Sequence, residues 1–311
     1  MQVVLLFPGQ GSQKPGMAKD LAEAFPAAKA ALDAADQALG VSLSKLMFEG
    51  PAEDLTLTHN AQPALLAHGA AIWAVVKDTV RPRTVAAAGH SLGEFTAYHA
   101  AGLFGLQDAV KLVRRRGELM YETGVQQPGT MAAILGEMSR SVEEICEEAS
   151  AAGVVVPANY NCPGQIVISG EVSGVEKAME LCKAAGAKRA IKLNVSGAFH
   201  SPLMQPAFQG LMMALSMANM QKSMAFPVYT NVDTAPSTAQ NAVATLANQL
   251  VSPVRWTMEI ENMAAAYPNA TFVEMGPGSV LVGLVKKIAP NVKTMTCGTA
   301  TEVNALLEAV A

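Results

Sequence analysis

The sequence predicts an α/β protein in which a large domain with a parallel central sheet carries a smaller inserted subdomain. Short apolar runs alternate with amphipathic helical stretches over the first 125 residues, which is typical of a parallel sheet covered by helices. This alternation changes after the Gly- and Pro-containing stretch 124–129. A chain of 311 residues is also long enough to form two domains.

Hydrophobic periodicity predicts the elements of the first part of the chain. A buried strand at 2–7 and a second one at 85–88 are short, apolar and bounded by polar residues or glycine. The predicted helices have apolar residues at helical spacing, and they cover 17–39, 62–80, a stretch that begins at 92, and 106–122.

The inserted segment has a different order of elements. Strands are predicted at 130–135, 154–158, 165–169 and 188–195, and helices at 141–151 and 172–185, with an Asn-rich turn at 159–164. This βαββαβ order is the ferredoxin-like pattern. We therefore expect a ferredoxin-like subdomain over 126–196, and a large catalytic domain made of 1–125 and 197–311.

Composition excludes several classes of protein. The net charge of −4 and the pI of about 5.8 argue against nucleic acid as the main partner. No apolar stretch is long enough for a membrane span, and the first residues lack the basic start of a signal peptide. The four cysteines form no C-x-x-C pair, which indicates neither a zinc site nor a disulfide framework and favours a cytoplasmic location.

The pentapeptide Gly89-His90-Ser91-Leu92-Gly93 is the most informative motif. It lies between a predicted strand and a predicted helix, the setting in which a G-x-S-x-G serine sits on a tight turn with its hydroxyl exposed. A side chain at position 89 or 93 would collide with the neighbouring strand or helix. The motif therefore predicts that Ser91 is a nucleophile.

His200 is the best candidate among the five histidines for the base that such a serine needs. It lies in a turn of small residues where the chain returns from the inserted segment, and loops at domain junctions often reach into a cleft. The alternative is that His200 caps the helix starting near Pro202. The other histidines are poorer candidates because of their positions: His59, His68, His90 and His99.

Two further parts of a serine site are predicted from the sequence. No carboxylate is an evident third member of a triad; Asp233 is conceivable, but a backbone carbonyl could orient the imidazole equally well. The segment Gly9-Gln10-Gly11 follows the first buried strand and allows close approach to a ligand. We expect the backbone N–H groups of Gln10 and Leu92 to form an oxyanion hole.

An arginine on the helix at 106–122 suggests the charge of the substrate. On a helical wheel Arg116 falls nearest the buried stripe and Arg115 faces water. A buried guanidinium needs an anionic partner, and its fork matches a carboxylate. This partner is either a substrate carboxylate or a structural glutamate such as Glu94. The predicted stripe consists of Leu106, Ala109, Val113, Gly117 and Met120.

Seven motifs in their order along the chain show a resemblance to a known family. They are FPGQGSQ, GHSLGE, the Arg-Gly pair at 116–117, NYNCPGQIVISG, AFHS, NQLVSPVRW and EMGPGSVL. Together they resemble the malonyl-CoA:acyl carrier protein transacylases of fatty acid synthesis and the related acyltransferase domains of polyketide synthases. The resemblance covers nearly the whole chain, and it implies a hydrolase-like core with an inserted ferredoxin-like lobe.

The resemblance also implies a reaction. Malonyl passes from malonyl-CoA to the phosphopantetheine thiol of acyl carrier protein through a malonyl-serine, without a metal or other cofactor. Position by position, it implies the following roles: nucleophile Ser91, base His200, carboxylate binding by Arg116, oxyanion binding by Gln10 and Leu92, orientation of the histidine by the carbonyl of Gln249, and cleft positions for His90, Asn159 and Asn161. Phe199, just before the base, implies malonyl rather than methylmalonyl, although some fatty acid enzymes have serine there.

The sequence also leads to expectations about binding partners and alternative functions. An acidic carrier protein requires a basic rim, for which the resemblance indicates Lys188 with Arg189 and Lys286 with Lys287; solvated ends of helices and strands are the other explanation for such pairs. No nucleic acid or membrane partner is expected. The alternative functions are a malonyl acyltransferase of a polyketide pathway and, from a different class, a serine hydrolase or thioesterase.

Overall fold

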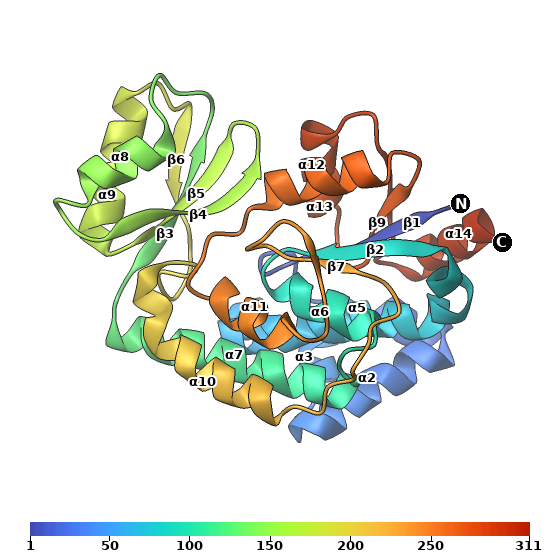
Figure 1. Cartoon of the computed structure of the whole chain (residues 1–311). Helices are drawn as coiled ribbons and strands as arrows, with labels where there is room; N and C mark the ends of the chain where they lie inside the picture. Colours follow the sequence, from blue (N-terminus) through green and yellow to red (C-terminus); the bar gives the residue numbers. More distant parts are fainter.

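The computed structural model describes all 311 residues, and it consists of a larger and a smaller part (Figure 1). The larger part contains a six-stranded sheet of order β10-β9-β1-β2-β7-β8, in which only β8 is antiparallel to its neighbour. The α/β class with a mainly parallel central sheet, predicted from the sequence, is therefore confirmed. Its strands are β1 (Val3–Phe7), β2 (Thr84–Gly89), β7 (Val228–Tyr229), β8 (Pro236–Ser237), β9 (Thr271–Glu274) and β10 (Lys293–Thr296).

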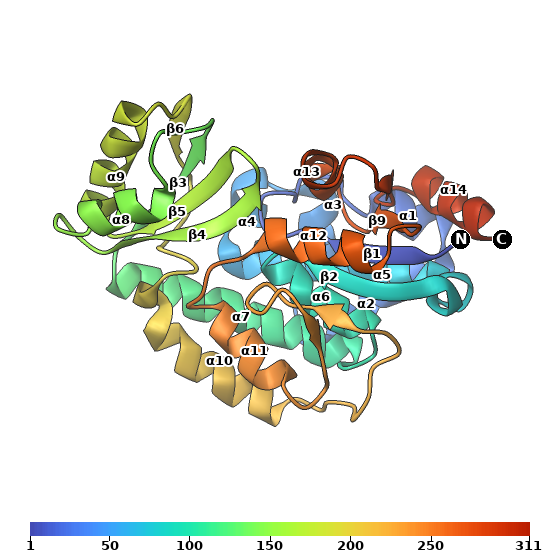
Figure 2. The same cartoon turned by 45° about the horizontal axis from the view of Figure 1, so that its top comes forward.

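Helices cover both faces of this sheet (Figures 1 and 2). Alternation along β1 assigns the faces: Val3, Leu5 and Phe7 pack in the main core, whereas Val4 and Leu6 pack in a second core with α12 and α13. The helices of the larger part are α1 (Lys19–Ala24), α2 (Pro26–Leu39), α3 (Leu43–Glu49), α4 (Ala52–Thr56), α5 (Thr58–Val80), α6 (Leu92–Ala100), α7 (Leu106–Gln126), α10 (Gln205–Met217), α11 (Ala242–Gln249), α12 (Trp256–Ala266), α13 (Val280–Ile288) and α14 (Ala300–Val310).

The smaller part has its own antiparallel sheet and its own apolar core. The strand order is β4-β5-β3-β6, with α8 and α9 packed in that core. Its elements follow the predicted βαββαβ order: β3 (Thr130–Leu135), α8 (Val142–Ala149), β4 (Val155–Cys162), β5 (Gln165–Gly170), α9 (Val172–Ala184) and β6 (Arg189–Lys192). The side chain of Ser141 caps α8 by accepting a hydrogen bond from the amide of Glu144.

Predicted boundaries differ from the structure in several places. The helix expected at 17–39 is two helices, because Phe25 precedes a proline, adopts an extended conformation and ends α1. The Asn-rich segment at 159–164 is mostly strand: β4 continues through Asn159 and Asn161 to Cys162, so the reversal occurs only at Pro163-Gly164. The last strand of the insert is also shorter than 188–195.

No helix in the structure combines the length and the apolar character that crossing a membrane requires. All four cysteines are free and buried.

Candidate active site

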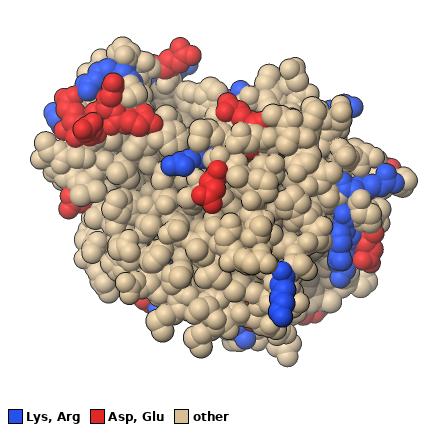
Figure 3. Space-filling model, viewed as in Figure 1, with Lys and Arg blue, Asp and Glu red and all other residues tan.

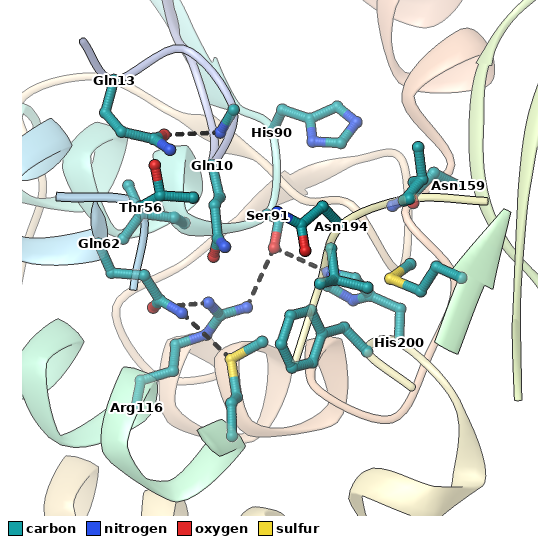
Figure 4. A pocket seen from close by; sticks show the side chains of 17 residues that line it. Gln10, Gln13, Thr56, Gln62, His90, Ser91, Arg116, Asn159, Asn194 and His200 are labelled. Atoms are coloured by element: carbon teal, nitrogen blue, oxygen red, sulfur yellow. Dashed lines mark hydrogen bonds between the residues drawn. The ribbon is translucent and has the colours of Figure 1, made fainter. Parts of the chain in front are cut away.

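A cavity of about 320 Å³ lies where the larger and the smaller part meet (Figure 4). The larger part contributes Ser91, Arg116 and His200 to its lining, and the smaller part contributes Met131 and Asn159. The cavity therefore brings together the nucleophile, the base and the arginine that were predicted from three separate stretches of sequence.

The turn that carries Ser91 has the predicted strand–turn–helix form, between β2 and α6. Ser91 has φ 52° and ψ −106°, a conformation that an L-residue adopts only at a cost. A Cβ on Gly89 would lie 1.9 Å from the carbonyl carbon of Gly93, and one on Gly93 would lie 2.0 Å from the carbonyl oxygen of Phe7. The expected need for both glycines is confirmed.

His200 is in hydrogen-bond contact with Ser91. The Nε2 atom of His200 lies 2.7 Å from Oγ of Ser91, and its Nδ1 lies 2.9 Å from the backbone carbonyl oxygen of Gln249. Because a carbonyl can only accept, Nδ1 carries the hydrogen and Nε2 is left free to accept the serine proton. The alternative role of His200 as a helix cap is wrong, since Ser201 caps the following turn.

The surroundings of His200 keep its imidazole neutral. Burial, and next the positive charge of Arg116, lower the pKa of His200 from its ordinary value of 6.5 to about 3. Its side chain is only 4 % exposed. The imidazole therefore stays unprotonated, with Nε2 open as an acceptor, throughout the neutral pH range.

Arg116 lies on α7, is 1 % exposed, and points at the serine (Figure 4). Its guanidinium donates to Oε1 of Gln62 (2.8 Å), to Oγ of Ser91 (3.1 Å) and to Oε1 of Gln249 (3.0 Å). All three acceptors are neutral.

The structural ion pair with Glu94 is not formed. Oε2 of Glu94 instead accepts hydrogen bonds from the amide of Asn231 and from Nε2 of Gln249. Burial lowers the pKa of Arg116 to about 10, so the guanidinium stays charged at neutral pH. A buried cation beside a hydroxyl and without a directly paired carboxylate is suited to hold the anionic end of a ligand.

The predicted oxyanion residues also lie at the cavity. Gln10 and Leu92 both line it. Leu92 is the first residue of α6, so its N–H has no partner within the helix, and neither backbone amide donates a hydrogen bond elsewhere in the chain. A free amide at the N-terminus of α6 and another in the loop after β1 form a suitable site for a developing negative charge.

The remaining predicted residues divide between the cavity and the surface. His90, Asn159 and Phe199 line the cavity. Asn161 does not; its Oδ1 lies 2.8 Å from Nε2 of His90 and thereby supports that ring. The four basic residues expected at the rim are exposed outside the cavity: Lys188, Arg189, Lys286 and Lys287.

Several polar residues of the site were not predicted. Gln62 contacts Arg116, and Asn231 and Glu259 lie buried behind the serine. A buried amide in the apolar helix α5 was the available signal for Gln62. The contacts of Asn231 join segments about 140 residues apart, and no sequence pattern indicated them. No group of three or more His, Cys, Asp or Glu side chains is arranged to hold a metal ion.

Comparison with known proteins agrees with this site. A family model described as acyl transferase domain matches residues 4–302. The chain therefore belongs to the acyltransferase family. It is 48 % identical over 297 residues to the malonyl CoA-acyl carrier protein transacylase of Bacillus subtilis. The aligned residues cover 94 % of this chain and 92 % of that protein. It is 42 % identical to the protein of the same name from Escherichia coli K12, over 99 % of both chains.

Solved structures of malonyltransferases are also similar to this chain over its whole length. The acyl-carrier-protein S-malonyltransferase of Bartonella henselae superposes with a TM-score of 0.95 at 43 % identity, covering 100 % of this chain and 99 % of that one. A malonyl-transacylase solved in complex with a type II polyketide synthase acyl-carrier protein has a TM-score of 0.94 at 39 % identity, covering 99 % and 100 %. Within the acyltransferases, the chain belongs to the malonyl CoA-acyl carrier protein transacylases.

Proposed function

We propose that this protein transfers the malonyl group from malonyl-CoA to the phosphopantetheine thiol of an acyl carrier protein, through a malonyl ester on Ser91. The observation that supports this most strongly is a shared contact: Oγ of Ser91 lies 2.7 Å from Nε2 of His200 and 3.1 Å from a guanidinium nitrogen of Arg116. A base and a carboxylate-binding cation thus meet at one nucleophile.

In the first half-reaction, Nε2 of His200 takes the Ser91 proton while Oγ attacks the thioester carbonyl carbon of malonyl-CoA. The backbone amides of Gln10 and Leu92 stabilise the negative charge on the carbonyl oxygen. The carbon–sulfur bond then breaks, and the imidazolium returns its proton to the leaving CoA sulfur. The carbonyl of Gln249 holds the ring in place and stabilises its transient charge.

In the second half-reaction, the phosphopantetheine thiol enters the same cavity. His200 takes the thiol proton, the sulfur attacks the ester carbonyl, and Ser91 leaves with the proton from His200. Throughout, Arg116 binds the distal carboxylate of malonyl and keeps the acyl group in position. Phe199 lines the cavity beside His200 and leaves little room for an α-methyl substituent.

The low pKa of His200 leads to a prediction for the pH profile of acylation. Since the pKa in the folded protein is about 3, the base stays neutral as the pH falls from 8 to 5. Burial raises the pKa of Glu94 to about 7, and its protonation in this range removes a negative charge near Arg116, which does not weaken carboxylate binding.

We expect the single-turnover rate constant of acylation to change by less than about threefold between pH 8 and pH 5. An imidazole with an ordinary pKa would be almost fully protonated at pH 5, and the rate constant would fall by about 30-fold. Rapid-quench measurements after pH jumps give this constant. A fall of that size centred near pH 6.5 would contradict the assignment of a buried, neutral base.

We propose that the carrier protein docks on the exposed pair Lys286 and Lys287 in the last turn of α13. The partially negative C-terminal end of the α13 dipole stabilises these two cations, and their positive charge suits an acidic partner. Lys188 and Arg189 form a second basic candidate. Acidic side chains gather over α8 on the smaller part (Figure 3), and an acidic carrier would avoid that surface.

Replacing Lys286 and Lys287 together with glutamate should slow malonyl transfer to the carrier protein by roughly tenfold or more at low salt. The rate of Ser91 acylation by malonyl-CoA should stay unchanged, because the pair lies outside the cavity. The control is the double replacement of Lys111 and Lys222 with glutamate, which makes the same charge change at exposed positions elsewhere. Equal losses in both half-reactions would mean that the pair serves the structure and not docking.

We propose that the reaction supplies fatty acid synthesis, as the resemblance of the sequence motifs implies. Supply of a polyketide pathway is a second candidate, favoured by the similarity to the malonyl-transacylase solved with a polyketide carrier protein. A hydrolase or thioesterase is less well supported, since His200 is oriented by a carbonyl and Arg116 is available for an acyl carboxylate. No nucleic acid, membrane or metal takes part in the proposed reaction.

We also propose the finer features of the architecture. The strand order β4-β5-β3-β6 and the βαββαβ succession support a ferredoxin-like subdomain over 126–196. The turn at Ser91 between β2 and α6 supports a hydrolase-like core made of 1–125 and 197–311. A cytoplasmic location is part of the same proposal.

The function is tested by product formation. Purified protein is incubated with malonyl-CoA and carrier protein carrying its phosphopantetheine arm, and malonyl carrier protein is measured by mass spectrometry. The proposal requires malonyl on the carrier at a rate far above that of malonyl-CoA hydrolysis. Hydrolysis as the main reaction would identify a thioesterase instead.

A further inference from the structure

Asn231 lies buried behind the nucleophile and bridges the two ends of its turn. Its Oδ1 accepts a hydrogen bond from the backbone N–H of Ser91 (2.8 Å), and its Nδ2 donates to the carbonyl oxygen of Gly89 (2.9 Å). One amide thus contacts the last residue of β2 and the residue that directly precedes α6. It is fully buried and does not line the cavity.

The turn needs such a contact. Ser91 adopts φ 52° and ψ −106°, a sparsely populated conformation that persists only where the surrounding contacts hold it. The N–H of Ser91 donates to Oδ1 of Asn231 and to no other group, so it would be unsatisfied if Asn231 were absent. This backbone conformation fixes the position of Cβ, and Oγ, one bond beyond it, then reaches both Nε2 of His200 and the guanidinium of Arg116.

Two buried carboxyl groups and one amide determine how Asn231 is oriented. Nδ2 of Asn231 donates to Oε2 of Glu259 (2.8 Å), and its backbone N–H donates to Oε2 of Glu94 (3.0 Å). Nε2 of Gln249 donates to Oδ1 of Asn231 (3.2 Å), to the carbonyl oxygen of Ser91 (3.0 Å) and to Glu94 (2.8 Å). Donors face Oδ1 and acceptors face Nδ2, so a flipped amide would lose every contact.

We propose that Asn231 is a positioning residue for the nucleophile: its amide, fixed by Glu259 and Gln249, holds the backbone of Ser91 in the conformation that aims Oγ at His200. The inference rests on the proposed role of Ser91. It assigns to Glu259 a function through Asn231, with no contact to substrate. Misplacement of a nucleophile by about 1 Å can cost about 100-fold in rate.

The test measures the single-turnover rate constant and the final extent of Ser91 acylation in Asn231→Ala. We expect the rate constant to fall tenfold or more while the final extent stays near that of the unaltered protein, because the turn is misplaced but present. A fall of less than tenfold would overturn the inference. A reduced final extent of Ser91 acylation that accounts for the whole loss of rate would also overturn the inference, since that result identifies a purely structural residue.

A charge-exchanged pair keeps the inference testable if Asn231→Ala does not fold. Asn231→Asp keeps an acceptor for the Ser91 amide but puts a carboxylate in place of the NH2 group that donates to Glu259 and to the carbonyl oxygen of Gly89. Adding Glu259→Gln supplies a donor to that carboxylate. The single-turnover rate constant of the double variant should be at least tenfold higher than that of Asn231→Asp. No recovery would overturn the proposed coupling.

The control is Asn262→Ala. The Nδ2 atom of Asn262 donates to the carbonyl oxygen of Thr234, three residues after Asn231, and does not contact Ser91. The rate constant of Asn262→Ala should match that of the unaltered protein. Labelling rates with a serine-reactive fluorophosphonate are measured in parallel. They report on the position of Ser91 even if malonyl is not the substrate, so failure of the proposed function is distinguished from failure of this inference.

Discussion

Replacing Ser91 with alanine should abolish the covalent attachment of malonyl to the protein. The only atom lost is the oxygen that contacts both His200 and Arg116, so no other group can take its place as nucleophile. Loss of a nucleophile of this kind costs on the order of a millionfold in turnover. The measurement is covalent labelling by radioactive malonyl-CoA, followed through denaturing electrophoresis.

The matched control for this variant is Ser216→Ala on the exposed face of α10, which should label fully. Thermal unfolding of Ser91→Ala should show that the fold persists, since the turn is held by backbone contacts that alanine retains. Labelling that continues at the same stoichiometry in Ser91→Ala would remove this serine from the mechanism.

Replacing Arg116 with alanine should lower kcat/KM for malonyl-CoA by at least about 30-fold, or ~2 kcal/mol, the scale for losing one member of a desolvated charge pair. The reason is that the distal carboxylate of malonyl would enter a buried cavity without a cation to meet it. Acetyl-CoA carries no such carboxylate, so its kcat/KM should change less and the preference for malonyl should collapse.

Two variants separate the charge of Arg116 from its other roles. Arg115→Ala removes the neighbouring exposed arginine, which pairs with Glu118 and Glu122 at the surface, and should leave kcat/KM unchanged. Arg116→Lys keeps the positive charge but not the forked guanidinium. Its kcat/KM for malonyl-CoA should therefore fall between that of Arg116→Ala and that of Arg115→Ala. A preference for malonyl over acetyl that is the same in Arg116→Ala and in the unaltered protein would make Arg116 a structural residue only.

Local patterns account for the parts of the fold that were predicted. The strand at 130–135 is a short apolar run between Gly129 and Gly136, and the turn at Ser91 depends on glycines within two positions of the serine. Arg116 was placed on the buried face of its helix by periodicity alone. Phe25-Pro26 was available as a breaking signal within the predicted helix at 17–39 and was outweighed by the apolar pattern around it.

Contacts between distant segments account for what was missed. Asn159 and Asn161 suggested a turn by their residue type, yet pairing with β5 keeps them in a strand. Gln62 meets Arg116, Asn231 meets Ser91 and Glu259 meets Asn231 only after the chain has folded, and a single sequence carries no record of those contacts. The proton-accepting role of His200 was predicted, but its displaced pKa depends on burial that only the folded structure shows.

The most direct test of the central claim is the mass of the intact protein after brief exposure to malonyl-CoA, first without and then with carrier protein. The account predicts one added malonyl group per chain, carried on the peptide that contains Ser91, which disappears as malonyl carrier protein forms. An unchanged mass, or a malonyl group that stays on the protein when the carrier's thiol is supplied, would contradict it.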